Sequence, residues 1–355
     1  MRNKKILFVA DAKSIHTVKW VDYFVNKDYD VYLATFSSEN KTKCKNIFFL
    51  SDKQTQVRGG NYHYLFKIMR LKEIIKKIKP DIINAHYSYS LGFVSLFAKK
   101  LSHIDCEFSV VCHGSDILKP PNKFIFDKIN RYVLKNSDKI FAVSDQIADK
   151  IKTFGIDKKL FVGQYGIDIL SLDDVKVDSK DIDIFSNRTF DSNSRIIFLL
   201  DTLSSMSIVK NKRVVFILPT VLENDFSNLK TKYKNIEFYK SMEHNKMIGL
   251  LKRSKIYISA TKSDGTSLSL LEAMYCKCIP IVSNIVSNRS WIVSFLNGYL
   301  FDSKEELIRE IENVLVNYDE IYSKVNQLNR NLIKNRADYS IQMSKIENFL
   351  FEDSK

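Results

Sequence analysis

The sequence predicts an α/β protein with two domains, each built on a parallel sheet that helices cover on both faces. At 355 residues the chain exceeds one ordinary domain. Short, wholly apolar runs such as 6–10 alternate with amphipathic stretches such as 66–79, an order typical of buried parallel strands joined by helices. The alternation occurs twice, and two glycines at 163–168 interrupt it.

In the first half, we expect strands at 6–10, 30–35, 81–86, 108–112 and 139–143. The intervening helices are expected at 18–26, 66–79, 91–101, 124–136 and 145–154. The helix at 66–79 places its isoleucines and Leu71 on one face, and Pro80 ends it. This half is expected to form an N-terminal domain over residues 1–165.

In the second half, we expect strands at 182–186, 213–218, 236–239, 255–259 and 278–282. Helices are expected at 195–206, 243–252 and 267–275, and from 304 the chain is helical to its end. The domain is expected to span 166–338. The last segment, 339–355, is expected to pack back on the first domain.

The positive charge is concentrated in the first half. The net charge of the chain is +14, and residues 1–165 hold 29 Lys/Arg against 16 Asp/Glu. This asymmetry favours an anionic partner for the first domain, which could be a membrane surface, a polyphosphate or nucleic acid. The stretch 67–79 could lie on anionic lipid with its lysines, although the same pattern suits a helix that covers the sheet and solvates its lysines.

Location and metal content follow from what the sequence lacks. The apolar run at 6–10 is too short for a signal peptide and ends at Asp11, and no run is long enough to span a bilayer. We therefore expect a cytoplasmic protein. The five cysteines lack zinc-ligand spacing, so we expect reduced thiols and no metal. The sequence also shows no nucleic-acid-binding module.

The segment 263–274 (SDGTSLSLLEAM) carries the clearest chemistry. It follows an expected strand and opens a helix, whose first N–H groups and dipole form an anion site. Gly265 permits close backbone approach, so a diphosphate would fit there. Asp264 lies just before the helix and Glu272 about a turn and a half into it, at a plausible distance for a ribose diol. The alternative is that Asp264 only caps the helix and Glu272 is solvated.

This segment resembles the acidic signature of the retaining family 4 glycosyltransferases, the group 1 glycosyltransferases of the GT-B fold. The run 278–283 (CIPIVS) and Asn297-Gly298 are also similar to that family. The resemblance implies two Rossmann-like domains facing across a cleft. It also implies that Asp264 contacts the donor sugar and Glu272 the ribose. The family usually has Glu at the first of these positions, and here it is Asp.

The resemblance implies further donor contacts in the second domain. Arg188 ends the first strand of that domain, where the family places an arginine on the diphosphate. The family's lysine is replaced here by Asn193, and Arg195 is the candidate substitute. The helix start adds its own donor-binding residues, which are Gly265, Thr266, Ser267 and Leu268.

In the first domain, the run 110–116 (VVCHGSD) resembles the family loop whose His lies near the transferred sugar. The implied catalytic residues are therefore His113, Asp264 and Arg188. Loops after the other strands give the acceptor side, for which the candidates are Ser14, His16, His86 and Tyr87. The remaining histidines, His63, His103 and His244, have no such context.

With these features, the resemblance implies a retaining transferase that moves a sugar from a UDP- or GDP-sugar to a saccharide or lipid-linked saccharide. The reaction would serve cell-surface polysaccharide or glycoconjugate synthesis, at the inner face of the cytoplasmic membrane if the basic domain attaches there. The nucleotide-sugar is a substrate, and no cofactor or metal is expected. Two alternatives are a non-catalytic GT-B subunit that binds a sugar or a partner, and a sugar-nucleotide epimerase.

Overall fold

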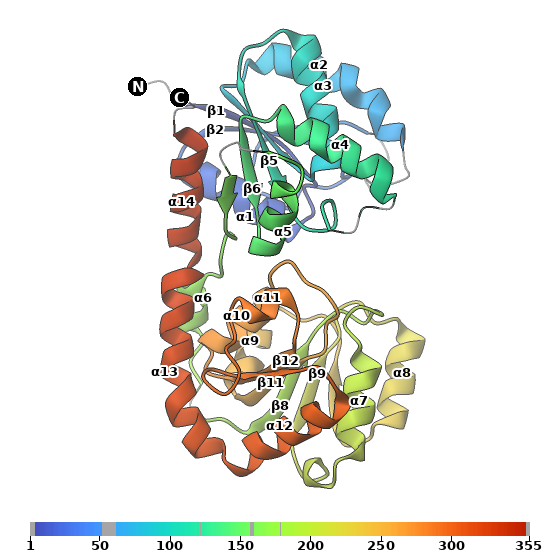
Figure 1. The fold of residues 1–355 in the computed structure, drawn as a ribbon, viewed down its shortest axis with the longest axis vertical. Coiled ribbons are helices and arrows are strands. Elements are labelled where there is room, and N and C mark those ends of the chain that lie inside the picture. Colours follow the sequence, from blue (N-terminus) through green and yellow to red (C-terminus); the bar gives the residue numbers. More distant parts are fainter. Residues whose placement is uncertain are drawn as a thin grey trace. The chain divides into compact units, whose positions relative to one another are not determined.

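The computed structural model describes residues 4–51, 62–118, 120, 122–156, 160–177 and 179–352. The chain divides into two compact units (Figure 1). The first comprises Met1–Tyr165 together with Gln342–Lys355, and the second comprises Gly166–Ile341. Each unit is built on its own parallel sheet, which confirms the predicted α/β fold class.

The first unit holds a seven-stranded sheet in the order β3-β2-β1-β4-β5-β6-β7, and every neighbouring pair is parallel. Its strands are β1 (Lys5–Val9), β2 (Asp30–Thr35), β3 (Asn46–Phe49), β4 (Ile82–His86), β5 (Glu107–Cys112), β6 (Lys139–Ala142) and β7 (Leu160–Val162). The central strands β4 and β5 are almost wholly buried, as expected when both faces of a parallel sheet are covered.

Helices cover both faces of this sheet. The core on one face joins the sheet to four helices, which are α2 (Ile68–Ile78), α3 (Phe93–Ser102), α4 (Lys123–Lys135) and α5 (Asp145–Lys152). A 3-10 turn η1 (Tyr62–Lys67) precedes α2, and a π-helical turn η2 (Ser88–Gly92) precedes α3. On the other face, Trp20 of α1 (Ile15–Asn26) and Phe349 of α14 (Tyr339–Phe351) both meet the ring of Phe141 on β6.

The second unit holds a six-stranded parallel sheet in the order β10-β9-β8-β11-β12-β13. Its strands are β8 (Ile182–Asn187), β9 (Val214–Ile217), β10 (Ile236–Tyr239), β11 (Ser254–Ser259), β12 (Ile279–Ser283) and β13 (Tyr299–Phe301). Neighbours β8 and β11 form the centre, so the segments that follow them emerge side by side at one edge of the sheet.

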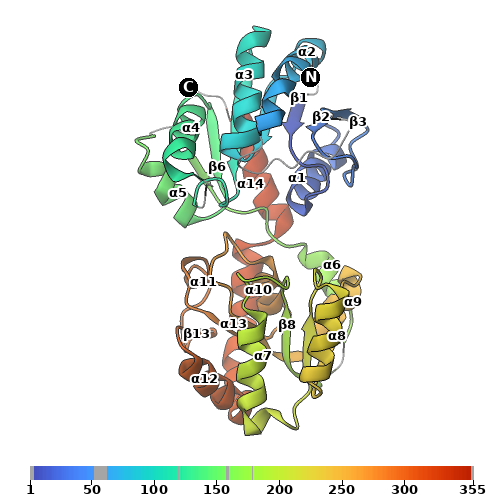
Figure 2. The ribbon, with the colours of Figure 1, turned by 90° about the vertical axis from the view of Figure 1, so that its right-hand side faces the viewer.

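Two hydrophobic cores flank the second sheet. One joins it to α7 (Ile196–Ser205), α8 (Glu223–Lys232) and α12 (Lys304–Val316), with η3 (Ser207–Val209) after α7 (Figure 2). The other joins it to α6 (Ile169–Asp174), α9 (His244–Lys252), α10 (Leu268–Tyr275) and α13 (Tyr318–Arg336). The short helix α11 (Val286–Arg289) follows β12.

Gly166 opens the second unit in a conformation that requires glycine. Its φ is +78°, in the left-handed region, and any Cβ would overlap the backbone of Ala337 and Asp338. This close approach lets the N–H of Ile167 donate to Ala337 O at 2.8 Å, while Tyr339 N donates to Ile167 O at 2.9 Å. The start of the second unit is thereby fixed to the end of α13.

The sequence missed the shortest elements and misplaced some helix starts. The strands β3, β7 and β13 have only three or four residues each, too few for a periodic pattern. The first helix was expected from residue 18 but begins at Ile15, so His16 lies in its first turn rather than in a loop. The helix expected from 91 begins at Phe93, after the π-helical turn.

The C-terminal helix is fixed to the first unit by Glu347. Its Oε2 accepts hydrogen bonds from Tyr23 Oη at 2.7 Å and Lys27 Nζ at 2.6 Å, and its Oε1 accepts from Tyr29 Oη at 2.7 Å. Burial alone would raise the pKa of Glu347, but the bonds from Lys27 and the two tyrosines outweigh it and lower that pKa. A lowered carboxyl pKa contributes stability that is present above the pKa of the unfolded chain and is lost as the pH falls through the folded pKa.

We predict that Glu347→Ala lowers the free energy of unfolding of the first unit by about 1–3 kcal/mol, because it leaves the hydroxyls of Tyr23 and Tyr29 without their acceptor. Denaturant unfolding at pH 7 measures the change. Asn348→Ala, at the exposed next position of the helix, is the matched control and should change stability little. Equal effects of the two substitutions would contradict the prediction.

Candidate functional site

The start of α10 lies beside the ends of β8 and β11 in the second unit. Ser267 caps the helix, since its Oγ accepts from Leu270 N at 3.3 Å. The predicted residues Gly265 and Thr266 lie in the loop between β11 and α10, where Thr266 Oγ1 donates to Gly265 O at 2.9 Å. Leu268 is the first helical residue. The first N–H groups of a helix have no acceptor within it, so this end of α10 suits an anion.

Arg188 follows β8 and reaches this helix start. Its Nη1 donates to Ser267 Oγ at 2.9 Å, and its Nη2 forms an ion pair with Asp264 Oδ2 at 2.8 Å. Burial alone would lower the pKa of Arg188, but Tyr257 and Asp264 raise it above its ordinary value. Asp264 and Ser267 therefore both contact the guanidinium of Arg188, as the sequence predicted for one site. The buried Nε–H of Arg188 makes no hydrogen bond within the described residues.

Arg195 lies nearby but is held differently. It occupies the left-handed region at φ +51°, and its Nε donates to Ala260 O at 2.6 Å, one residue after β11. Its guanidinium also lies 4.8 Å from the ring of Phe198. Asn193, at the position of the missing lysine, donates from Nδ2 to Ser263 O at 3.0 Å and so braces the loop before α10.

Glu272 points from α10 toward α9. Its side chain is 11 % exposed, and its Oε1 lies 3.0 Å from Nε2 of His244, the first residue of α9. No motif surrounds His244 in the sequence, so the sequence predicts no role for it. The sequence does carry one signal for His244: it begins a helix after a strand, at 236–239. Helices after strands begin at the carboxyl edge of a parallel sheet, where ligands bind.

The first unit gathers three histidines at the corresponding edge of its sheet. His86 ends β4 and His113 follows β5, and His113 Nε2 lies 3.1 Å from His86 Nδ1. The ring of His16 lies 5.3 Å from that of His113, and its Nδ1 is 2.5 Å from Tyr165 Oη. Tyr87 places its ring 4.6 Å from His113, with its backbone at φ +69°.

Ser14 lies just before this cluster. It occupies the N-cap position of α1, where its carbonyl accepts from Val18 N at 2.9 Å and its hydroxyl makes no capping bond. Asp116, for which the sequence predicted no role, joins the two loops that follow β4 and β5. Asp116 is buried and accepts from the backbone N–H groups of Ser88, His113 and Gly114 at 2.9–3.1 Å.

His86, which is buried, and His113, which is half-buried, are held neutral. Burial, with the nearby His16, lowers the pKa of His86 to about 3, and burial with both neighbours lowers the pKa of His113 well below its ordinary value. Within the described residues, Nε2 of His86 has no partner. A buried N–H without an acceptor is costlier than an unused lone pair, so the proton belongs on His86 Nδ1, which donates to His113. His113 then carries its own proton on Nδ1.

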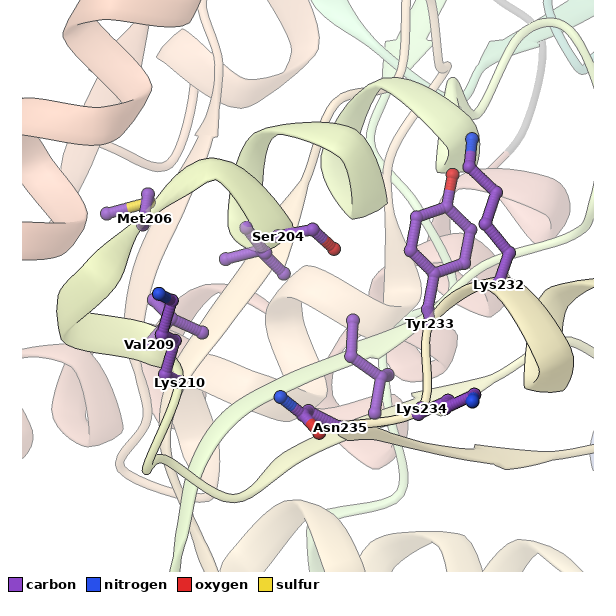
Figure 3. A pocket seen from close by; sticks show the side chains of 10 residues that line it. Ser204, Met206, Val209, Lys210, Lys232, Tyr233, Lys234 and Asn235 are labelled. Carbon is purple, nitrogen blue, oxygen red and sulfur yellow. The ribbon is translucent and has the colours of Figure 1, made fainter.

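A cavity of about 360 Å³ lies elsewhere in the second unit (Figure 3). It lies near the end of α7 and the start of β10, away from the start of α10, and none of the predicted site residues line it. Its walls are Leu203, Ser204, Met206, Val209, Lys210, Lys232, Tyr233, Lys234, Asn235 and Ile236. Among the described residues, no group of three His, Cys, Asp or Glu side chains is placed to hold a metal ion.

Two family models match the chain, and together they cover more than half of it. Residues 5–144 match the glycosyl transferase 4-like model, and residues 221–337 match the model of glycosyl transferases group 1. An uncharacterised glycosyltransferase of Methanocaldococcus jannaschii is 23 % identical over 307 residues, covering 81 % of each chain.

Solved structures share the fold. A glycosyltransferase from Rickettsia africae superposes with a TM-score of 0.79 at 17 % identity, over 99 % of this chain and 100 % of the other. HepE of Anabaena, solved in complex with UDP, superposes with a TM-score of 0.78 at 13 % identity, over 98 % and 99 %. Sucrose-phosphate synthase from Thermosynechococcus elongatus gives 0.77 at 11 %, over 98 % of both chains. The fold is therefore of the GT-B type.

We predict that the imidazoles of His86 and His113 stay neutral from pH 8 to pH 5, and that His113 carries its proton on Nδ1. Two-dimensional ¹H–¹⁵N spectra of the imidazoles, assigned with His86→Gln and His113→Gln, measure both properties. Below about pH 6.5, these two histidines take up protons in the unfolded chain but not in the folded protein. As the pH is lowered from there, the free energy of unfolding should therefore fall by up to about 1.4 kcal/mol per pH unit for each histidine. A titration midpoint near 6.5 for either ring would contradict the prediction.

Proposed function

Because the chain belongs to the group 1 glycosyltransferases, with a glycosyltransferase 4-like first half, we propose that it is a retaining transferase that uses a UDP- or GDP-sugar. The acceptor is a saccharide or a lipid-linked saccharide in cell-surface polysaccharide or glycoconjugate synthesis. Structures of HepE with UDP and with UDP-glucose support a nucleotide-sugar donor, since they share this fold.

The observation that carries this proposal is the grouping of Arg188 and the start of α10. Arg188 donates to Asp264 and Ser267, and within the described residues its buried Nε has no hydrogen-bond partner. A diphosphate placed there would accept charge-assisted bonds from the guanidinium and from the first N–H groups of the helix. The carboxylate of Glu272, further along the same helix, would accept hydrogen bonds from the ribose hydroxyls. Asp264 would contact the sugar from the loop before the helix.

In the proposed reaction, the bond between the anomeric carbon and the donor phosphate oxygen breaks while the acceptor hydroxyl attacks on the same face. The departing phosphate takes the proton of that hydroxyl, and its added negative charge is stabilised by Arg188 and the helix start. No protein nucleophile is involved, so positioning supplies much of the rate enhancement. In the first unit, His113, neutral and with its proton on Nδ1, would be a hydrogen-bond donor for a sugar hydroxyl.

We predict that a UDP- or GDP-sugar raises the melting temperature of the protein and that Arg188→Ala weakens this donor binding about 10- to 100-fold, because bonds to charged groups contribute about 1.5–3 kcal/mol. A thermal-shift screen with UDP-, GDP- and CMP-sugars, followed by calorimetry, measures both effects. Lys232→Ala removes an exposed cation elsewhere in the second unit and should leave affinity unchanged. Stabilisation by none of the nucleotide-sugars would contradict the donor site.

We also propose that the basic face of the first unit contacts an anionic membrane. The basic face is the surface of η1 and of the four helices on that side of the sheet, α2, α3, α4 and α5, which together carry 13 Lys/Arg and 4 Asp/Glu. On the other side of the sheet, α1 and α14 carry equal numbers of each sign. Within the described residues, no helix combines the length and apolar character needed to span a bilayer. The proposed attachment is at the membrane surface.

Exposed apolar side chains accompany this charge. Phe66, in η1 just before α2, and Phe124, in the first turn of α4, are 74 % and 70 % exposed, and exposed Met69 and Ile125 lie near them in the sequence. Apolar groups at an interface insert beside the lipid headgroups while lysines bind them, so the combination suits anionic lipid better than nucleic acid. In a parallel α/β unit these helix starts lie at the same edge as the histidine cluster, where a lipid-linked acceptor would arrive.

We predict that reversing Lys76 and Lys77 to Glu lowers binding to anionic vesicles by on the order of 30-fold or more, since each lysine near such a surface contributes about 1 kcal/mol. Sedimentation with phosphatidylglycerol-containing vesicles, compared with phosphatidylcholine vesicles, measures it. The control reverses Lys324 and Lys334, which are exposed on α13. Unchanged binding of the Lys76/Lys77 variant would contradict the membrane proposal.

A further inference from the structure

The contact between His244 and Glu272 joins two helices at the candidate donor site. His244 begins α9 and Glu272 lies within α10, and the 3.0 Å between Nε2 and Oε1 is a hydrogen-bond distance. Glu272 is largely buried, with 11 % of its side chain exposed, while 53 % of the His244 side chain is exposed. The imidazole therefore covers the carboxylate from the solvent side.

The surroundings of this pair belong to the same corner of the sheet. One turn after His244, Met247 Sδ accepts a weak bond from Asn187 Nδ2 at 3.2 Å, and Asn187 immediately precedes Arg188. Ser269, on α10, donates to Asn187 O at 3.5 Å. Asn187 at the end of β8 thus contacts both α9 and α10, and its buried Oδ1 is an acceptor without a partner within the described residues.

A buried carboxylate that binds a diol must be fixed in one orientation. An ionised carboxylate has two oxygens and about four acceptor positions. If His244 donates from Nε2, it uses one position on Oε1 and leaves Oε2 and the rest of Oε1 for other donors. The bond also selects one side-chain orientation out of those that a glutamate can adopt, so a ligand need not supply the energy of ordering it.

We propose that His244 is a positioning residue for donor binding, which holds the Glu272 carboxylate in the orientation that accepts the ribose hydroxyls of the nucleotide. This inference rests on the proposed function, because it takes Glu272 as the ribose-binding group. A pair that only joined α9 to α10 would stabilise the fold equally whether or not the ligand carried those hydroxyls. Dependence on the ribose hydroxyls therefore separates the two roles.

The test measures the affinity of the full chain for UDP and GDP by calorimetry, and then for the 2′-deoxy and 3′-deoxy forms of the tighter nucleotide. For the wild type we expect about tenfold preference for the ribonucleotide, as for loss of a bond to a charged group. His244→Ala should reduce this preference to about twofold. His244→Gln should restore it, because the glutamine amide donates from nearly the position of Nε2.

A double-mutant cycle completes the test. Glu272→Ala should abolish the preference, and His244→Ala should have no further effect in that background, because coupled residues are not additive. Lys246→Ala is the matched control, since Lys246 is exposed on the same helix and should leave the preference unchanged. Melting temperatures of the unliganded variants report any change in folding.

The outcomes separate the two proposals. If the wild type binds neither nucleotide, the proposed function is overturned, and the inference about His244 is overturned with it. If the wild type binds and prefers the ribonucleotide but His244→Ala keeps that preference, only the inference about His244 is overturned. Loss of affinity for ribo- and deoxyribonucleotides by the same factor would also overturn it, since that result describes a purely structural pair.

Discussion

The structure depends on one constraint, the parallel pairing of every strand in both sheets. Each strand then ends at the same edge of its sheet, and the segments after neighbouring strands must emerge together. This is why His86 and His113 touch although 27 residues separate them, and why Arg188 meets Asp264 across 76 residues. An antiparallel neighbour would have sent one member of each pair to the opposite edge. The chemistry of each unit is therefore a consequence of its topology.

The largely buried side chain of Arg188 imposes a second requirement. A charge removed from water needs a partner of opposite sign, and Asp264 supplies it at 2.8 Å. In the proposed site, Asp264 therefore has two roles: it is the counter-ion of Arg188 and it contacts the sugar. An arriving diphosphate would share the guanidinium, which frees part of the carboxylate at the moment the sugar arrives. Although Asp is one methylene shorter than Glu, the side chain of Asp264 reaches Arg188 directly.

The sequence was sufficient for the parts of the molecule that repeat a pattern. The buried central strands and the helix at 267–275 were expected because apolar runs and helix-start residues leave local signals. Edge strands such as β3 are too short to show alternation. The position of Arg195 depends on its left-handed backbone, and the contact of His244 depends on how α9 packs against α10. Both are tertiary properties without a signature along the chain.

The neutral histidines bear on how the proposed reaction handles its proton. A general base must accept a proton near the working pH, and the burial that lowers the pKa of His86 to about 3 excludes that task for it. The pKa of His113 is also lowered, and in the inferred tautomer its Nε2 accepts the hydrogen bond from His86 Nδ1. His113 can therefore act only as a hydrogen-bond donor, through an Nδ1–H whose direction the ring contacts fix. In the proposed reaction, the proton of the acceptor hydroxyl would instead go to the departing phosphate, whose charge Arg188 would stabilise.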